Sequence, residues 1–236
     1  FDLTDPSNIS STIDSYQPDE FYNLAAQSHV DTSFKQPSTT FEINTSGVIN
    51  ILEAIRKHSS ATKFYQASSS EMFGNSVDDD GCQRLTTPMN PVSPYGVSKV
   101  MGYNLTRHYR NAYKLHACNG ILFNHESPLR GETFVTRKIT RGIAEIVLGL
   151  KKKIWLGNLN AQRDWGHARD FVEAMWMMLQ QDEPDDYVVA TGVGATIKDF
   201  ANASFSHVGL KWEDHVEVDK KYMRPTEVDA LIGDPS

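Results

Sequence analysis

The sequence is most constrained by an alternation of short apolar runs with longer runs of helical periodicity. Apolar runs occupy residues 21–24 and 62–67, and a third ends at Phe123. Between them the spacing predicts one helix that ends near His58 and another that begins at Pro94. Strands that alternate with helical patterns of this length are typical of a parallel sheet wound by crossover helices. We therefore expect an α/β fold.

Polar clusters follow each of the three predicted strands. They are Gln27-Ser28, Ser69 to Glu71 and Asn124 to Glu126. Ligands of wound α/β sheets bind at the carboxyl ends of the strands, so these clusters predict a shared site. The small residues Ala25-Ala26 after the first strand would let the backbone approach a ligand closely. A plain loop would give the same composition.

The stretch from Ser93 to Lys99 is the strongest candidate for catalysis. Pro94 suits the first turn of a helix, and the four-residue spacing of Tyr95 and Lys99 places both on one helix face. An ammonium beside a phenol stabilises the phenolate, so we expect Lys99 to lower the pKa of Tyr95 and let it exchange a proton with a sugar or alcohol hydroxyl. The pair alone is equally compatible with an exposed lysine one turn from a core tyrosine.

The second half of the chain changes character and predicts a smaller lobe over the ligand. Basic residues alternate there with turns, at Arg130, Lys138, Arg163 and Arg224. Guanidinium groups bind phosphate bidentately, so arginines that converge on one pocket would suit a diphosphate. Each arginine taken singly also fits an ordinary surface position.

Composition excludes several functional classes. The chain has 236 residues, a net charge of −7 and 39% hydrophobic residues, which argues against nucleic-acid binding. Two cysteines and no His-Glu-x-x-His pattern predict neither a disulfide framework nor a metal site. No run of 18 apolar residues and no signal peptide is found, so we expect a cytoplasmic protein without a membrane partner.

Longer strings in the chain resemble a known family. Tyr95-x-x-x-Lys99 after a serine-rich strand end is similar to the extended short-chain dehydrogenase/reductases. Phe64 to Glu71, Gly120 to Pro128, Arg163 to His167 and Arg224 to Asp229 resemble, within that group, the GDP-mannose 4,6-dehydratase family. The resemblance covers essentially the whole chain and implies a Rossmann-like, doubly wound parallel sheet with a smaller C-terminal substrate-binding lobe.

The resemblance also implies a reaction, the dehydration of GDP-mannose to GDP-4-keto-6-deoxymannose through transient hydride transfer to bound NADP. Tyr95 would remove the C4 hydroxyl proton, and Lys99 would bind the nicotinamide ribose. Glu71 would then abstract the proton at C5, and the hydroxyl of Ser69 would assist the loss of water from C6. A carboxylate base beside hydroxyl donors is what such an elimination needs.

The same match implies the binding residues and the division of the chain. The cofactor would contact Asp2, Leu3, Leu24, Ala25, Ala26, Gln27, Ser28, Lys99, His125 and Arg130. The GDP-sugar would contact Ser70, Asn124, Glu126, Lys138, Arg163, Arg224 and Glu227. We expect residues 1–124 and 164–192 to form the dinucleotide-binding part and residues 125–163 and 193–236 to form the substrate lobe. Members of this family assemble as dimers or tetramers, so a homodimer or homotetramer is expected.

Several departures from the family pattern bear on these expectations. Ser69, Thr39 and Leu129 stand where the family usually has threonine, tyrosine and arginine. The Gly-rich strand–turn–helix that binds the pyrophosphate is not found, so we expect a truncated chain that binds NADP poorly. Two alternatives stay open: a GDP-sugar epimerase or reductase of the same fold, and a truncated chain without catalytic activity.

Overall fold

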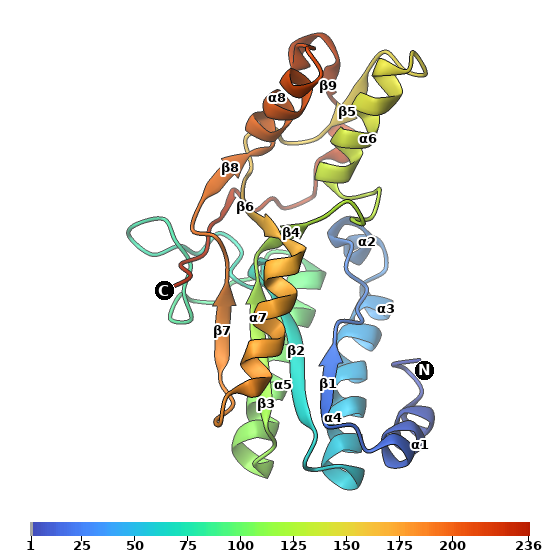
Figure 1. Cartoon of the computed structure of the whole chain (residues 1–236), viewed down its shortest axis with the longest axis vertical. Coiled ribbons are helices and arrows are strands. Elements are labelled where there is room, and N and C mark those ends of the chain that lie inside the picture. Colours follow the sequence, from blue (N-terminus) through green and yellow to red (C-terminus); the bar gives the residue numbers. More distant parts are fainter. Residues whose placement is uncertain (1) are drawn as a thin grey trace.

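The computed structural model describes residues 2–236, and Phe1, the first residue of the expected dinucleotide-binding part, lies outside the described residues. Figure 1 shows two parts stacked along the long axis of the molecule. One is built on a four-stranded sheet with helices on both faces. The other is a smaller lobe of short strands and two helices.

The larger part confirms the predicted parallel sheet. Its strands are β1 (Glu20–Asn23), β2 (Lys63–Ser69), β3 (Ala117–Leu122) and β7 (Asp186–Val189), in the order β1-β2-β3-β7 with every pair parallel. On one face lie α1 (Pro6–Tyr16), α4 (Gly47–His58) and α5 (Pro94–Tyr113), and on the other lies α7 (Ala168–Gln180) (Figure 1).

Alternation along the strands explains why both faces are covered. Phe64 and Ala117 are fully buried against α1 and α4, whereas their neighbours Tyr65 and Cys118 are fully buried against α7. Successive side chains of a strand point to opposite faces, so a strand with consecutive apolar residues needs a helix on each side. The sheet is therefore an interior layer, and its carboxyl edge is left to form the site.

One helical stretch of this part was not predicted. It consists of α2 (Val30–Lys35), α3 (Pro37–Phe41) and a π-helical turn, Glu42–Ser46, that continues directly into α4. The turn buries two polar residues, Asn44 and Thr45, instead of the apolar residues that periodicity detects. Single π turns inside helices are rare and recur at functional sites.

The smaller lobe holds two short sheets and two helices. One sheet has β10 (Ala230–Leu231), β6 (Gln162–His167) and β4 (Asn124–Glu126) in that order, with β8 (Gly194–Thr196) antiparallel to β6. The other pairs β5 (Ile154–Leu156) with β9 (Val216–Val218). The helices of the lobe are α6 (Val135–Val147) and α8 (Ile197–His207), and its 3-10 turns are Trp212–Asp214 and Lys220–Tyr222. A third 3-10 turn, Ser70–Met72, follows β2 in the larger part.

The lobe has a core of its own, in which Ile139 and Ile143 of α6 pack with Phe205 of α8. The predicted boundary between residues 163 and 164 falls inside β6, which pairs only with strands of this lobe among residues 2–236. No helix within the described residues is both long enough and apolar enough to span a bilayer.

Candidate active site

Helix α5 begins with a cap that fixes the position of Tyr95. The Ser93 hydroxyl accepts a hydrogen bond of 3.0 Å from the backbone N–H of Gly96, as an N-cap serine does. Tyr95 and Lys99 lie on the same face of the helix. The Lys99 side chain is buried, its Nζ donates to the carbonyl of Ala67 at 2.8 Å, and it lies 5.7 Å from the centroid of the Tyr95 ring.

The two titrating groups are shifted mainly by burial. Desolvation raises the pKa of Tyr95 to about 12, the Ser69 hydroxyl opposes that shift by hydrogen bonding, and the charge of Glu71 adds to it. Desolvation lowers the pKa of Lys99 to about 8. The direction for Tyr95 is opposite to the one expected from the sequence. The reason is that the Lys99 ammonium is directed at a backbone carbonyl, so burial of the phenol decides the shift.

The end of β2 lies directly against the start of α5. Ser69 closes β2, and its Oγ accepts a hydrogen bond of 3.3 Å from the backbone N–H of Glu71. A Cβ added at Gly96 would lie only 2.7 Å from the carbonyl oxygen of Glu71, so this close approach requires a glycine there. The contact brings Ser69, Glu71 and Tyr95 to one place, although 26 positions separate Ser69 from Tyr95.

The Glu71 carboxylate has one oxygen paired and one unpaired. Its Oε1 lies 3.3 Å from Nη1 of Arg224, whereas Oε2 is buried without a hydrogen-bond partner among the described residues. Arg163 is buried nearby and donates to the carbonyl of Val228 at 3.0 Å. Burial lowers the pKa of Arg163, and the charge of Glu71 opposes that shift. A buried, unpaired carboxylate oxygen is rare in native proteins and calls for an explanation.

A cavity of about 540 Å³ opens in front of this carboxylate. Its wall brings together nine of the sequence-predicted residues, namely Ser28, Glu71, Asn124, Glu126, Arg130, Lys138, Arg163, Arg224 and Glu227. Ser70 does not line it, because that side chain is buried in the turn after β2. The volume lies in the range of ligand sites.

Not every cation of the cavity is free to bind a ligand. Arg130 Nε lies 3.3 Å from Glu126 Oε2 in an ion pair that lacks hydrogen-bond geometry, and its guanidinium stacks 3.8 Å from the ring centroid of Phe134. The same Glu126 oxygen accepts a hydrogen bond of 2.6 Å from Thr136. The Glu126 carboxylate is therefore already engaged by Arg130 and Thr136. Arg224 is ion-paired with Glu71, and Lys138 makes no ion pair within the described residues.

Predicted cofactor residues divide into those near the site and those away from it. Asp2 is exposed and accepts hydrogen bonds from Thr4, and Leu3 packs into the core beside α4, so neither lines the cavity. Leu24, Ala25, Ala26 and Gln27 form the connection from β1 to α2. His125 donates from Nδ1 to the carbonyl of Phe123 at 2.8 Å, and burial lowers the pKa of its imidazole.

Asn44, a residue that sequence reasoning passed over, fastens this connection. Its Oδ1 accepts from the backbone N–H of Gln27 at 2.8 Å, and its Nδ2 donates to the carbonyl of the same residue at 3.0 Å. Nδ2 also donates to the hydroxyl of Ser98 in α5 at 3.0 Å. The only signal in the sequence is a polar residue inside a helical pattern, which is too weak to single out Asn44.

Two further residues of the cavity wall, Lys221 and Tyr222, were also missed. The Tyr222 ring has the ammonium of Lys138 at 3.4 Å from its centroid and that of Lys221 at 4.8 Å. Burial lowers the pKa of Lys138, and the neighbouring charge of Lys221 adds to the shift. The aromatic residue two positions before Arg224 is the signal that could have found Tyr222.

Comparisons with known proteins agree on one family. The family described as GDP-mannose 4,6 dehydratase matches residues 1–236. GDP-mannose 4,6 dehydratase 1 of Arabidopsis thaliana is 56% identical over 239 residues, which cover all of this chain and 65% of that protein. The GDP-mannose 4,6-dehydratase of Vibrio cholerae serotype O1 is 48% identical, with all of this chain and 70% of that protein covered. The chain thus spans about two thirds of the length of these relatives.

Solved structures with the same fold include RMD from Pseudomonas aeruginosa complexed with NADPH, with a TM-score of 0.87, 25% identity and coverage of all of this chain and 78% of that one. The UDP-glucose 4-epimerase of Thermus thermophilus, in complex with NAD, has a TM-score of 0.86 at 24% identity, with all of this chain and 75% of that one covered. At that identity the likeness concerns the fold alone. By the match over its whole length, the chain belongs to the GDP-mannose 4,6 dehydratase family.

Proposed function

We propose that the protein carrying this chain dehydrates GDP-mannose to GDP-4-keto-6-deoxymannose, with NADP as cofactor. The observation that carries the proposal is the Glu71 carboxylate, whose Oε2 is buried and has no hydrogen-bond partner within residues 2–236. The charge of Glu71 acts on the Tyr95 phenol, which is hydrogen-bonded to Ser69. An elimination needs a base of this kind, because the proton removed is on carbon. The names of relatives up to 56% identical give the same substrate.

Residues suited to the nicotinamide end of a dinucleotide are present. The Lys99 ammonium has three donors and spends one on Ala67, which leaves two for ribose hydroxyls beside Tyr95. Ser28, which lines the cavity, offers a further donor. Arg130 contributes only the guanidinium N–H groups that its ion pair with Glu126 leaves free. A nicotinamide held by these residues would supply reversible hydride transfer to and from the sugar. The NADPH complex of RMD supports a nicotinamide cofactor, and the choice of NADP rests on the family resemblance.

The side chains of this chain then divide the proton transfers among themselves. Tyr95 takes the proton of the C4 hydroxyl as its phenolate, which burial disfavours and the hydrogen bond from Ser69 favours. Lys99 holds the ribose in place next to it. A ketone at C4 acidifies the hydrogen at C5, which Glu71 removes through its unpaired Oε2. The C5 proton taken by Glu71 passes to the C6 hydroxyl, which leaves as water with a hydrogen bond from Ser69 to assist it. Glu71 and Ser69 act on adjacent carbons, as their common position after β2 permits.

Two arginines and a lysine suit the diphosphate. Arg224 is ion-paired with Glu71, and the charge of Glu71 acts on Arg163. Lys138 of α6 lines the same cavity as both arginines. Guanidinium groups bind phosphate oxygens bidentately and pay little desolvation for it. Asn124 offers an amide to the sugar. Glu227 accepts from the backbone N–H of Arg224 at 2.9 Å, so it shapes the loop that carries the arginine.

The principal competitor is an epimerase or reductase acting on a GDP-sugar. The fold does not separate these reactions, since a UDP-glucose 4-epimerase has nearly the same TM-score as RMD. Glu71 does separate them, because neither simple reduction nor C4 epimerisation needs a carboxylate base at that strand end. The dehydratase is therefore favoured.

The test uses the protein carried to the full length of its relatives. Incubated with GDP-mannose and no added reductant, it is expected to give a 4-keto-6-deoxy product detected by mass spectrometry. Glu71→Gln is expected to abolish the loss of water while NADP stays bound. A C4 or C2 epimer as sole product would remove the dehydratase proposal, and turnover of the Glu71→Gln variant within a few-fold of wild type would remove Glu71 from the reaction.

A second measurement addresses the 236-residue chain itself. Calorimetric titration with NADP tests the alternative of a truncated, non-catalytic chain. Micromolar binding by this chain would count against that alternative, and no measurable binding would support it.

A further inference from the structure

The segment from Arg224 to Asp234 lies between two parts of the chain that approach it from opposite sides. On one side is β6, and on the other is the long loop 74–92, which joins the turn after Glu71 to the helix of Tyr95. Figure 1 shows this loop beside the C-terminal end of the chain.

The β6 side of the segment determines where Arg163 lies. Leu231 of β10 pairs with Arg163 in parallel register, and the backbone N–H of Gln162 donates to the carbonyl of Asp229 at 2.7 Å. The Arg163 guanidinium in turn donates to the carbonyl of Val228. Any displacement of the segment therefore moves the partners of Arg163.

Two side chains of the loop, Asn75 and Gln83, hydrogen-bond to the backbone of the segment. Asn75 donates from Nδ2 to the carbonyl of Glu227 at 3.0 Å and accepts at Oδ1 from the N–H of Asp229 at 2.8 Å. Gln83 is fully buried, donates to the carbonyl of Ala230 at 3.3 Å and accepts from the N–H of Ile232 at 3.1 Å. Each side-chain amide thus takes the place of a neighbouring strand. It donates to one carbonyl of the segment and accepts from the backbone N–H two residues later.

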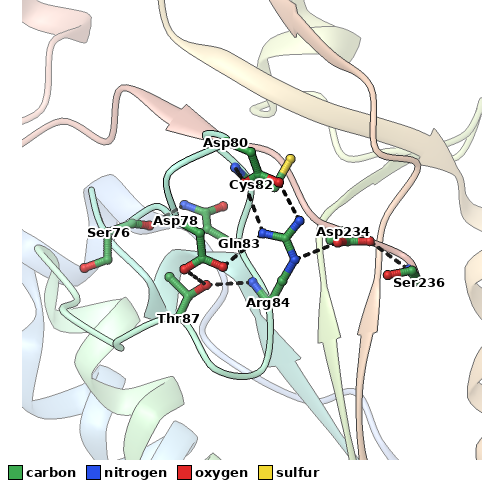
Figure 2. Close-up of polar contacts among 9 residues, drawn as sticks. All are labelled: Ser76, Asp78, Asp80, Cys82, Gln83, Arg84, Thr87, Asp234 and Ser236. Atoms are coloured by element: carbon green, nitrogen blue, oxygen red, sulfur yellow. Dashed lines mark hydrogen bonds and ion pairs between the residues drawn. The ribbon is translucent and has the colours of Figure 1, made fainter.

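Arg84 attaches the loop to the C-terminal end of the segment (Figure 2). Arg84 lies between three carboxylates, with Asp234 at 2.6 Å from Nε, Asp78 at 3.0 Å from Nη1, and Asp80 completing the set. The loop and the end of the segment are held together there, away from the cavity. Asn75 holds the end that is near the cavity. It follows Glu71 by four residues, and its partner Glu227 follows Arg224 by three.

We propose that Asn75 and Gln83 are positioning residues that hold Arg163 and Arg224 against Glu71 and thereby set the geometry of the diphosphate site. The inference rests on the proposed function for the identity of the ligand. The loop begins just after Glu71 and ends just before Tyr95. Its hydrogen bonds to the segment therefore connect both catalytic residues to the arginines. Neither amide lines the cavity, and each acts through the backbone of the segment.

The test compares Asn75→Ala with a matched control, Asn90→Ala. Asn90 is exposed and lies in the same loop, and within residues 2–236 its amide donates only to the hydroxyl of Ser76, at 2.8 Å. In the full-length protein, Asn75→Ala is expected to raise both the KM for GDP-mannose and the Kd for GDP about fivefold, the effect of one ordinary hydrogen bond. NADP affinity is expected to stay unchanged, and Asn90→Ala is expected to stay within twofold of wild type throughout.

A second measurement does not depend on the ligand. Hydrogen exchange of the backbone amides of residues 224–231 is expected to accelerate in Asn75→Ala and not in Asn90→Ala. Gln83→Met keeps the volume of the side chain but removes its hydrogen bonds, and it is expected to accelerate exchange in residues 230–234. Equal exchange in the two asparagine variants would overturn the inference whatever reaction the protein performs.

The outcomes separate this inference from the proposed function. If wild type makes no dehydrated product, the function is wrong, and the exchange experiment still decides the positioning role. If wild type is active and Asn75→Ala changes thermal stability but neither the GDP affinity nor the exchange of residues 224–231, the positioning role is wrong and the function stands.

Discussion

The ammonium of Lys99 lies inside the protein with one backbone carbonyl as its partner, which makes the folded state sensitive to pH. Burial lowers its pKa from 10.5 to about 8. Between these two values the unfolded chain holds the proton and the folded chain does not, so stability due to this residue rises with pH. The cost of burying the ammonium is therefore greatest below pH 8.

This cost predicts the behaviour of Lys99→Met. The free energy of unfolding of wild type minus that of the variant is expected to increase by about 3 kcal/mol between roughly pH 7.5 and 10.5, since one pKa unit corresponds to about 1.4 kcal/mol. Urea unfolding of both proteins across this window measures it. Tyr95, whose pKa is raised to about 12, is present in both proteins and so cancels in the difference. Parallel curves for the two proteins would contradict the prediction.

At the scale of elements, the contact between the end of β2 and the start of α5 holds the catalytic groups together. A Cβ at position 96 would lie 2.7 Å from the Glu71 carbonyl and 2.9 Å from Cβ of Pro91. Both neighbours are rigid, since one is backbone and the other a ring. The helix would have to move away from β2 to accept a side chain, and Tyr95 would move with it.

Gly96→Ala is accordingly expected to lower the free energy of unfolding by about 1–3 kcal/mol, as overpacking does, and to reduce turnover of the full-length protein at least tenfold. Gly102→Ala is the matched control in the same helix. A Cβ there would meet its nearest neighbour, the carbonyl of Asn44, at an ordinary 3.5 Å. This control is expected to be neutral or stabilising by up to about 1 kcal/mol. Unfolding curves that coincide for the two variants would refute the tight contact at Gly96.

Elements of this size are also where sequence prediction succeeds and fails. Apolar periodicity predicts α4 and α5 and the strands β2 and β3, because their burial is repeated at a fixed spacing. The polar strand ends predict which residues meet at the cavity. The strands β4, β8 and β10 have only two or three residues, too few to show a period, and β6 is as long as β3 but mostly polar. All four form because distant segments pair with them.

The residues missed at the site have the same explanation. Asn44 and Asn75 act through hydrogen bonds to backbone that is 17 or more positions away, and Tyr222 faces a lysine from another helix. No local pattern records such partners. The direction of the Tyr95 pKa was mispredicted for a related reason, since the spacing of Tyr95 and Lys99 indicates proximity but not the burial that decides the shift.

At the scale of the whole molecule, Asp164 of β6 joins the two parts of the structure. Its side chain is fully buried and accepts from the backbone N–H groups of Thr191 at 2.9 Å and Gly192 at 2.9 Å, where the chain passes from β7 to β8. It also accepts from the hydroxyl of Thr191 at 2.6 Å and from the N–H of Gly233 at 3.4 Å. One carboxylate thus holds the passage between the sheets and the C-terminal segment.

Asp164→Ala removes these acceptors and leaves buried donors unpaired, so it is expected to lower the free energy of unfolding by about 3–5 kcal/mol. Asp164→Asn keeps one acceptor oxygen and is expected to lose less. Three of the four tryptophans, Trp155, Trp165 and Trp212, lie in the smaller lobe, so fluorescence reports mainly on that lobe and far-UV circular dichroism on the whole chain. The two signals are expected to coincide during unfolding of wild type and to separate in Asp164→Ala, because non-coincident probes indicate that two parts unfold independently. Coincident transitions in the variant would mean that the parts are coupled by other contacts and that Asp164 contributes stability without joining them.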